Sequence, residues 1–330
     1  MSGVKCTNKR IAAFLCMIIA VSACLTGCGS AAYSMPYDMD SSVTAYRFQD
    51  GDSGNLADLF AQDLCVSDED VSVNSVDTSE AEAAILCSIN DKEVLYGKNT
   101  NEQLNPASLT KVMTAIVALK YGNLDDMLTA SENVEISEPG ATLVGIKPGD
   151  TMTLDQALHA LLMPSGNDAA VMIAEYIAGS ETAFVDMMNE EAAALGATNC
   201  HFMNPHGLTA EDHYITAYDM YLIFNEAIKY DEFVQIITAS EYSGVYHDAA
   251  GEPKELSFTT SNQFINGNHE VPEGVVVIGG KTGTTNAAGN CLVLLSKDSS
   301  GNPYISVILK CSQRDYLYDE MYDLINLVNQ

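Results

Sequence analysis

The segment "NPASLTKVMTAIVALKYG", residues 105–122, predicts an apolar helix that carries two reactive side chains in its first turn. Asn105, followed by proline, is typical of an N-cap and a first helical position, and Gly122 favours a stop at the other end. Apolar residues recur between them at helical spacing, so the helix should pack in a core. Ser108 and Lys111 lie three residues apart and therefore share one face.

A serine beside a buried lysine forms a chemically useful pair. Burial disfavours the charged amine and lowers its pKa, and the positive end of a helix acts in the same direction. A neutral Lys111 would accept the proton of Ser108 as that hydroxyl attacks a carbonyl carbon. The alternative is a lysine that extends to solvent beside a serine at a helix start. Because S-x-x-K also occurs at residues 2–5, the motif alone does not decide.

A second motif, "PSGNDAA" at residues 164–170, lies at a turn between two helical patterns. Such a connection can present the hydroxyl of Ser165 and the amide of Asn167 to a cleft. The hydroxyl can relay a proton, and the amide can hold a substrate carbonyl or the lysine. The alternative is that one of them only caps the following helix.

A third motif, "GGKTGTTNAAGN" at residues 279–290, continues a strand pattern with an unusual number of glycines. Glycine in a strand indicates that another backbone comes close, and Gly283 would let an extended ligand pair along the strand. Lys281, Thr282 and Thr284 would face an anion. The alternative is a loosely paired edge strand, but K-T-G occurs only here in the chain.

Strand patterns at both ends of the 81–330 region flank a helical middle. Five of them are expected, at residues 83–89, 92–97, 274–285, 290–297 and 304–311. Helical patterns dominate residues 153–238, and an amphipathic helix closes the chain. This order predicts an α+β fold, with one antiparallel five-stranded sheet packed with helices and a helical lobe beside it.

The N-terminal region predicts export and a lipid anchor. A basic start and the short apolar run at residues 11–23 are typical of a signal peptide. "LTGC", residues 25–28, resembles the lipobox of bacterial lipoproteins, which implies that Cys28 becomes the lipidated first residue of a membrane-bound protein. The alternative is a plain secretion signal. We expect a signal peptide at 1–27, an acidic flexible linker at 28–80, and a catalytic domain at 81–330 with no β-rich domain after it.

Composition removes other classes of function. The formal net charge of -30 repels phosphate backbones, so nucleic acid is not an expected partner. The histidines show no H-E-x-x-H and no paired metal spacing, so a zinc carboxypeptidase is disfavoured and neither metal nor cofactor is expected. Five cysteines follow the leader without any C-x-x-C, and most should be small buried hydrophobes, although a single disulfide stays open.

The three motifs together identify a family. S-x-x-K, S-x-N and K-T-G occur in this order on a helix start, an inter-helix turn and a strand, as in class A β-lactamases and penicillin-binding proteins. With "NPASLTKVMTA", "FMNPHGLTAEDHYITAYDM" and "GGKTGTTNAAGNCLV", the chain resembles the serine D-alanyl-D-alanine carboxypeptidases of the S11 type, the low-molecular-mass penicillin-binding proteins. The likeness covers roughly residues 83–315 and implies their transpeptidase-like fold.

The resemblance implies a role for each motif residue. Ser108 would form the acyl-ester with peptidoglycan stem peptides ending in D-Ala-D-Ala, with Lys111 as base. Ser165 and Asn167 would assist proton transfer and substrate holding. The terminal carboxylate would bind Lys281, Thr282 and Thr284 on the Gly283 strand, and the backbone N–H groups of Ser108 and Thr284 would form an oxyanion hole. β-Lactams would acylate the same serine, in the cell envelope outside the cytoplasm.

Two related functions stay as alternatives. A β-lactamase needs a deacylating carboxylate, typically in an E-x-x-L-N loop, and the sequence has none between Asn167 and Lys281. A penicillin-binding sensor or wall-binding lipoprotein that has lost turnover would keep all three motifs, so the sequence does not separate it from an enzyme.

Overall fold

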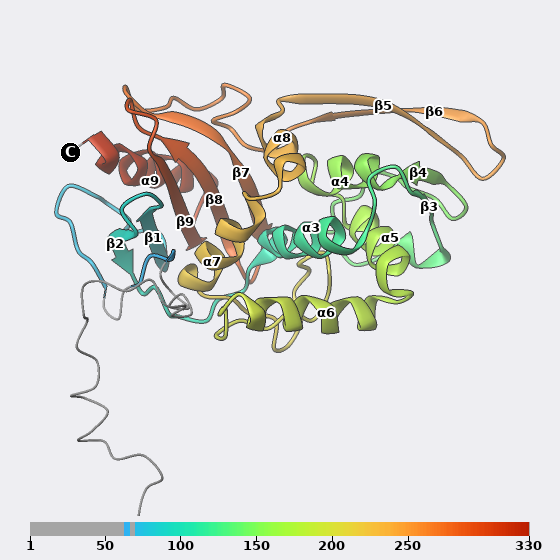
Figure 1. The fold of residues 1–330 in the computed structure, drawn as a ribbon, viewed down its shortest axis with the longest axis horizontal. Coiled ribbons are helices and arrows are strands. Elements are labelled where there is room, and N and C mark those ends of the chain that lie inside the picture. The colour runs from blue at the N-terminus through green and yellow to red at the C-terminus, as the bar shows by residue number, and fades with distance from the viewer. Residues whose placement is uncertain (1–62, 67–69, 330) are drawn as a thin grey trace, which may run out of the picture. The chain divides into compact units, whose positions relative to one another are not determined.

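Five antiparallel strands from the two ends of the catalytic region form the main sheet in the computed structural model, which describes residues 63–66 and 70–329 (Figure 1). Their order is β2-β1-β9-β8-β7. β1 pairs with β9 from Ala83↔Leu309 to Ser88↔Tyr304, so the first and last strands lie side by side. The strands are β1 Ala83–Ser88, β2 Glu93–Lys98, β7 Val276–Thr285, β8 Gly289–Lys297 and β9 Pro303–Cys311. The predicted five-stranded sheet is confirmed.

The sheet is buried on both faces, which explains the continuous apolar run in β8. Leu292 and Leu294 face the closing helix α9 (Arg314–Asn326), in a cluster with Met321 and Leu324 of that helix. The alternate residues of β8, such as Val293, face the larger core that the helices of the middle region complete. Side chains of successive strand residues point to opposite faces, so both sets must be apolar here.

The helical lobe surrounds α3 (Thr110–Tyr121), whose residues 110–118 are all buried. This helix contacts four helices of the lobe: α4, α5, α6 and α7. The lobe consists of α4 Leu154–Leu162, α5 Asn167–Ala178, α6 Glu181–Ala194, α7 Ala217–Ala227 and α8 Asp231–Thr238. Burial of α3 on all sides holds the end that carries the S-x-x-K motif in a fixed place.

The start of this helix differs from the prediction. Residues Ala107–Leu109 form a 3₁₀ turn, η1, before α3 begins at Thr110. Asn105 is not an N-cap, because its side-chain Nδ2 donates to the carbonyl of His213 at 2.9 Å. Gly122 does end α3, but with φ -102° rather than a left-handed backbone. A Cβ on Gly122 would lie 2.9 Å from the backbone oxygen of Ala118 and 2.5 Å from Leu154 Cδ2, so close packing favours glycine here.

A second, smaller sheet was not predicted. It has the order β3-β4-β5-β6 and combines two three-residue strands with a hairpin. The strands are β3 Met127–Thr129, β4 Thr151–Thr153, β5 Glu241–His247 and β6 Pro253–Thr259. The hairpin lies beside α4, where Tyr242 stacks on His159 with ring centroids 3.8 Å apart (Figure 1).

Residues upstream of 81, which the sequence analysis assigned to the linker, contact the catalytic domain. The amide of Gly97 in β2 donates to Val71 O at 2.9 Å, and Thr78 Oγ1 is 2.6 Å from Tyr96 OH. Cys65 is buried, and its amide donates to Tyr221 OH at 2.9 Å. The predicted signal peptide, Cys28 and the linker up to residue 62 lie outside the described residues.

The five cysteines after the leader are free thiols, of which Cys65, Cys87, Cys291 and Cys311 are buried and Cys200 is partly exposed. In residues 63–66 and 70–329, no helix combines the length and the apolar character that crossing a bilayer demands.

Candidate active site

Lys111 lies at the centre of the site with its side chain fully buried. Its Nζ is 2.9 Å from Ser108 Oγ, 2.6 Å from Asn167 Oδ1 and 2.5 Å from the carbonyl oxygen of His206. The alternative of a lysine that extends to solvent is therefore wrong. Two of the three motifs, S-x-x-K and S-x-N, thus meet at this one amine.

The partners of Lys111 direct its lone pair at the serine. Burial lowers the pKa of the amine well below its usual value, the charge of Lys281 lowers it further, and Asp168 opposes both. The oxygens of Asn167 and His206 can only accept, so they take the two hydrogens of a neutral amine. Its lone pair then faces Ser108 Oγ, the one partner that can donate.

Ser165 and Asn167 reach Lys281 and Lys111 from the turn between α4 and α5. Ser165 has a left-handed backbone, with φ 72°, and Gly166 rather than either motif residue stands at the N-cap, with no side-chain cap. The alternative, that Ser165 or Asn167 only caps a helix, is therefore wrong. Asn167 binds Lys111, and Ser165 Oγ accepts from Lys281 Nζ at 3.0 Å.

Lys281 is the second buried amine of the site, only 1% exposed. It extends from β7 and also donates to the carbonyl of Thr282 at 2.8 Å. Burial lowers its pKa to about 7. Thr282 Oγ1 lies 2.7 Å from Ser261 Oγ, and Thr284 is exposed beside Asn290. Lys281 and Thr282 of the K-T-G motif, with Thr284 directly after it, thus supply an amine and two hydroxyls from β7.

Gly283 lets β7 pass directly against the turn that carries Ser108. A Cβ at this position would lie 3.0 Å from Ser108 N and 3.1 Å from Pro106 O. β7 is the outer strand of the main sheet, paired on one side with β8. β7 is therefore an edge strand, as the alternative interpretation has it, and it also lies close to another backbone, as the glycines indicate. The two interpretations of this strand are compatible.

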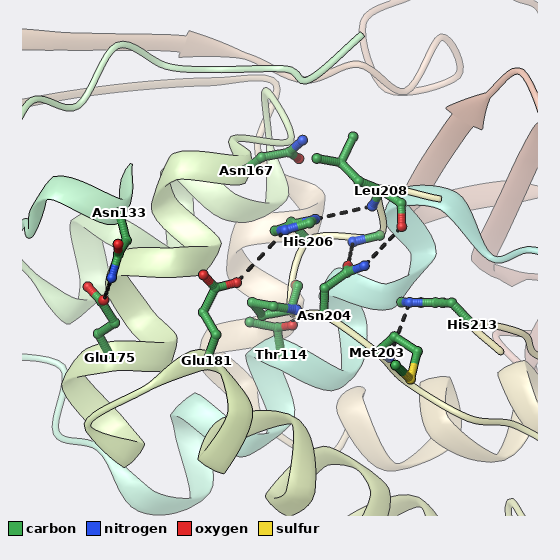
Figure 2. A network of polar contacts seen from close by, with 12 residues as sticks. Thr114, Asn133, Asn167, Glu175, Glu181, Met203, Asn204, His206, Leu208 and His213 are labelled. Atoms are coloured by element: carbon green, nitrogen blue, oxygen red, sulfur yellow. Dashed lines mark hydrogen bonds and ion pairs between the residues drawn. The ribbon is translucent and has the colours of Figure 1, made fainter. Parts of the chain in front are cut away.

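The loop around His206 contributes a site residue through its backbone (Figure 2). Asn204 ties the loop from within, because its side chain accepts from Gly207 N at 2.7 Å and donates to Leu208 O at 2.9 Å. Thr114 Oγ1 donates to Pro205 O at 2.6 Å. These contacts hold the His206 carbonyl at Lys111. Every residue has a carbonyl, so no residue type in the sequence marks this contact.

The ring of His206 is neutral and accepts a hydrogen bond within the same loop. Its Nδ1 accepts from Leu208 N at 3.1 Å, and Nε2 lies 3.9 Å from Glu181 Oε2 (Figure 2). Burial lowers the pKa of His206 to about 3, and the positive charge that Lys111 and His213 carry when protonated acts in the same direction. The contact with Glu181 is therefore one between a neutral ring and a carboxylate, and not an ion pair.

Asp168 was missed by the sequence analysis. It is buried beside Asn167 and accepts from three successive amides, Val144 N at 3.0 Å, Gly145 N at 2.8 Å and Ile146 N at 3.1 Å. These bonds hold the 142–146 loop over the start of α5. Its partners lie more than twenty positions away in the chain, so no local spacing indicated the role.

Comparison with known proteins decides the family. Residues 70–313 match the family model of peptidase S11, described as D-alanyl-D-alanine carboxypeptidase. The chain belongs to the peptidase S11 family. Among S11 relatives, D-alanyl-D-alanine carboxypeptidase DacF of Bacillus subtilis is 38% identical over 223 residues, which is 66% of this chain and 54% of the relative. DacC of Escherichia coli is 34% identical over 276 residues, 81% of this chain and 65% of the relative.

Solved structures agree with this S11 assignment. The Streptomyces K15 DD-transpeptidase is 25% identical, with a TM-score of 0.70 that covers 76% of this chain and 97% of that one. A putative penicillin-binding protein homologue from Mycobacterium tuberculosis is 29% identical, with a TM-score of 0.68 over 77% and 93% of the two chains. The fold is thus the predicted transpeptidase-like one. The chain spans between half and two thirds of the length of the two curated relatives named above.

Proposed function

We propose that this protein is a serine D,D-carboxypeptidase that removes the terminal D-Ala from peptidoglycan stem peptides. The observation that carries the proposal is the fully buried Lys111 amine, whose Nζ lies within hydrogen-bond distance of Ser108 Oγ, Asn167 Oδ1 and the His206 carbonyl. In its neutral form the amine would give its two hydrogens to the two carbonyl oxygens and turn its lone pair to Ser108 Oγ. Similarity to D-alanyl-D-alanine carboxypeptidases supports the substrate class.

Acylation begins when Ser108 Oγ attacks the carbonyl carbon of the penultimate D-Ala and passes its proton to Lys111 Nζ. The oxyanion lies between the backbone N–H groups of Ser108 and Thr284, which the close approach of β7 to Ser108 N supports. When the tetrahedral intermediate collapses, the amine of the terminal D-Ala leaves with a proton that Lys111 returns through Ser165. Water then hydrolyses the acyl-enzyme, with Lys111 or Ser165 as its base.

The substrate carboxylate binds on the other side of the cleft, at Lys281 and the hydroxyls of Thr282 and Thr284. The two buried amines have separate tasks: one must be neutral to accept a proton, and the other must be charged to hold an anion. The carboxylate of a bound ligand favours the charged form of Lys281, whose pKa in the ligand-free protein is about 7. A β-lactam carries an equivalent carboxylate and acylates the same serine.

One experiment tests the proposal. The full chain and its Ser108→Ala variant are incubated with a D-Ala-D-Ala peptide and, separately, with labelled penicillin. Release of D-Ala together with a lasting penicillin label on Ser108 supports a carboxypeptidase. Rapid loss of the label would instead identify a β-lactamase, and a label without any D-Ala release would identify a protein that has lost turnover.

The basic start, apolar run and lipobox-like "LTGC" support lipidation at Cys28, which would tether the domain to the outer side of a membrane. Replacement of Cys28 by alanine should then move the protein from the detergent phase to the aqueous phase in a detergent-partition assay. An unchanged partition would refute the anchor without affecting the proposed reaction.

A further inference from the structure

The residue before the proposed nucleophile has an unusual backbone. Ala107 has φ 48°, in the left-handed region that residues with a Cβ populate rarely. It opens the 3₁₀ turn η1 that carries Ser108. The direction of this one peptide unit decides where the Ser108 hydroxyl and amide point. A conformation of this kind persists only where surrounding contacts impose it.

Two buried side chains form a hydrogen-bond chain that ends at the Ala107 carbonyl. Thr110 Oγ1 donates to Ala107 O at 2.8 Å, and the same hydroxyl is 2.9 Å from His213 Nε2. Thr110 and His213 are almost completely buried, at 0% and 2% exposure. Solvent does not compete for these hydrogen bonds, so the protein alone sets their geometry.

The direction of each hydrogen in this chain follows from one backbone amide. Met203 N donates to His213 Nδ1 at 3.2 Å, so Nδ1 carries no hydrogen (Figure 2). In a neutral imidazole the hydrogen is then on Nε2, which donates to Thr110 Oγ1. Burial lowers the pKa of His213 to about 4, which favours this neutral ring. The Thr110 hydroxyl, already accepting, gives its own hydrogen to Ala107 O.

Residues 203–213 contact both ends of this hydrogen-bond chain. The carbonyl of His213 accepts from Asn105 Nδ2 at 2.9 Å, two residues before Ala107. Gly207 packs on Ala107 O so closely that a Cβ there would lie 2.0 Å from that oxygen. This segment also presents the His206 carbonyl to Lys111. It therefore contacts the nucleophile turn and the proposed base at once.

We infer that His213 and Thr110 are positioning residues, whose hydrogen-bond chain to Ala107 O holds Ser108 in its reactive orientation. The inference rests on the proposed function, because the orientation matters only if Ser108 is acylated. The ordinary alternative is that His213 is a core histidine whose ring is hydrogen-bonded to a neighbouring hydroxyl. The Phe202 ring packs edge-on to it, with ring centroids 5.9 Å apart. That role would affect stability alone.

The test measures acylation of the full chain by labelled penicillin under single-turnover conditions, which separates the binding constant from the acylation rate. Thr110→Val removes the hydroxyl with little change in volume, and Thr110→Ser retains it. His213→Leu removes the donor at the other end. Thr238→Val is the matched control, because the exposed Thr238 hydroxyl at the end of α8 also donates to a backbone carbonyl, Val234 O at 2.7 Å.

Thr110→Val should lower the acylation rate about 10- to 100-fold at an unchanged binding constant, the range expected when a reacting group is displaced by about 1 Å. Thr110→Ser should restore most of the rate, and Thr238→Val should keep it. If the two residues act as one chain, Thr110→Val with His213→Leu should be little slower than Thr110→Val alone. The label bound at completion counts the folded active molecules, so a loss of stability is not mistaken for a slower rate.

Two results would overturn the inference while leaving the proposed function intact. One is a normal acylation rate in Thr110→Val. The other is a slower rate in Thr110→Val that Thr110→Ser does not restore. If the unmodified protein were itself not acylated at Ser108, the proposed function would fail first. Should His213→Leu not fold, the two Thr110 variants still decide the question.

Discussion

At the scale of single residues, the site depends on two lysines kept from water. Lys111 and Lys281 are both buried, and the charge of Lys281 adds to the effect of burial on the pKa of Lys111. Burying an amine costs free energy while it is charged, and each lysine is accommodated by oxygen acceptors rather than by a carboxylate directly bonded to it. Burial and the proximity of the two amines thus favour loss of a proton from the Lys111–Lys281 pair.

The pH dependence of acylation should be bell-shaped. The rate constant for acylation at low penicillin concentration reports the free protein, in which Lys281 has a pKa of about 7. As pH rises through that value, Lys281 loses the charge that holds the carboxylate, so the rate should fall. As pH decreases, Lys111 gains a proton and stops acting as a base, so the rate should fall again. The two limits belong to the coupled pair of amines.

The Lys281→Ala variant supplies the control for this profile. It should acylate at least ten times more slowly, because the anion loses its charged partner, an interaction of about 1.5–3 kcal/mol. It should also lack the alkaline decrease, while thermal unfolding shows that the protein still folds. An alkaline decrease of the same size in Lys281→Ala would show that another group is responsible.

The motif side chains that meet in the site were predictable from sequence, and the contacts of His206 and Asp168, which involve backbone groups, were not. Ser108, Lys111, Asn167 and Lys281 combine in one cleft because each motif fits its element. The contact of His206 uses a carbonyl, which has no sequence signature. Asp168 binds amides far along the chain.

At the scale of elements, the close passage of β7 past η1 predicts a strict requirement at Gly283. An alanine Cβ would lie 3.0 Å from Ser108 N, nearer than ordinary contacts, so the strand or the nucleophile turn must shift by a few tenths of an ångström. We expect Gly283→Ala to slow acylation by about 10-fold or more, since small displacements of reacting groups are costly.

The measurement compares the acylation rate and the unfolding temperature of Gly283→Ala with those of Gly244→Ala. Gly244 lies in strand β5 of the second sheet, where an added Cβ would meet the end of the Tyr242 side chain. That variant should acylate at the normal rate. Equal rates in the two variants would show that the approach of β7 to Ser108 is not critical.

Elements were predicted well where burial is complete and poorly where it is partial. β1, β8 and β9 have apolar runs that no turn signal interrupts, and they are buried along most of their length. β3 and β4 are three residues long, too short for a period to appear, and β5 alternates between exposed and half-buried residues. The predicted N-cap at Asn105 is wrong because the Asn105 side chain donates instead to the backbone carbonyl of His213, which is distant in the sequence.

At the scale of the whole molecule, the sheet is built from both ends of the catalytic region, so the stability of β1 and β2 depends on what covers them. The 70–80 segment does part of this. Asp70 accepts from the amide of Asn99 at 2.7 Å, Lys98 Nζ donates to Thr78 O at 2.6 Å, and Glu80 N donates to the α9 residue Glu320 at 2.6 Å. These bonds place the effective start of the domain upstream of residue 81.

A chain that begins at residue 82 should therefore be less stable than one that begins at residue 63. Loss of several hydrogen bonds, each contributing about 1 kcal/mol net, should lower the free energy of unfolding by roughly 3 kcal/mol. For a domain of this size that corresponds to a decrease of about 10 °C in the unfolding temperature. The segment contacts β2, α7 and α9 rather than the cleft, so the acylation rate of the folded fraction should not change. Equal unfolding temperatures would mean that residues 63–81 only lie on the domain, and that its stability is complete from β1 onward.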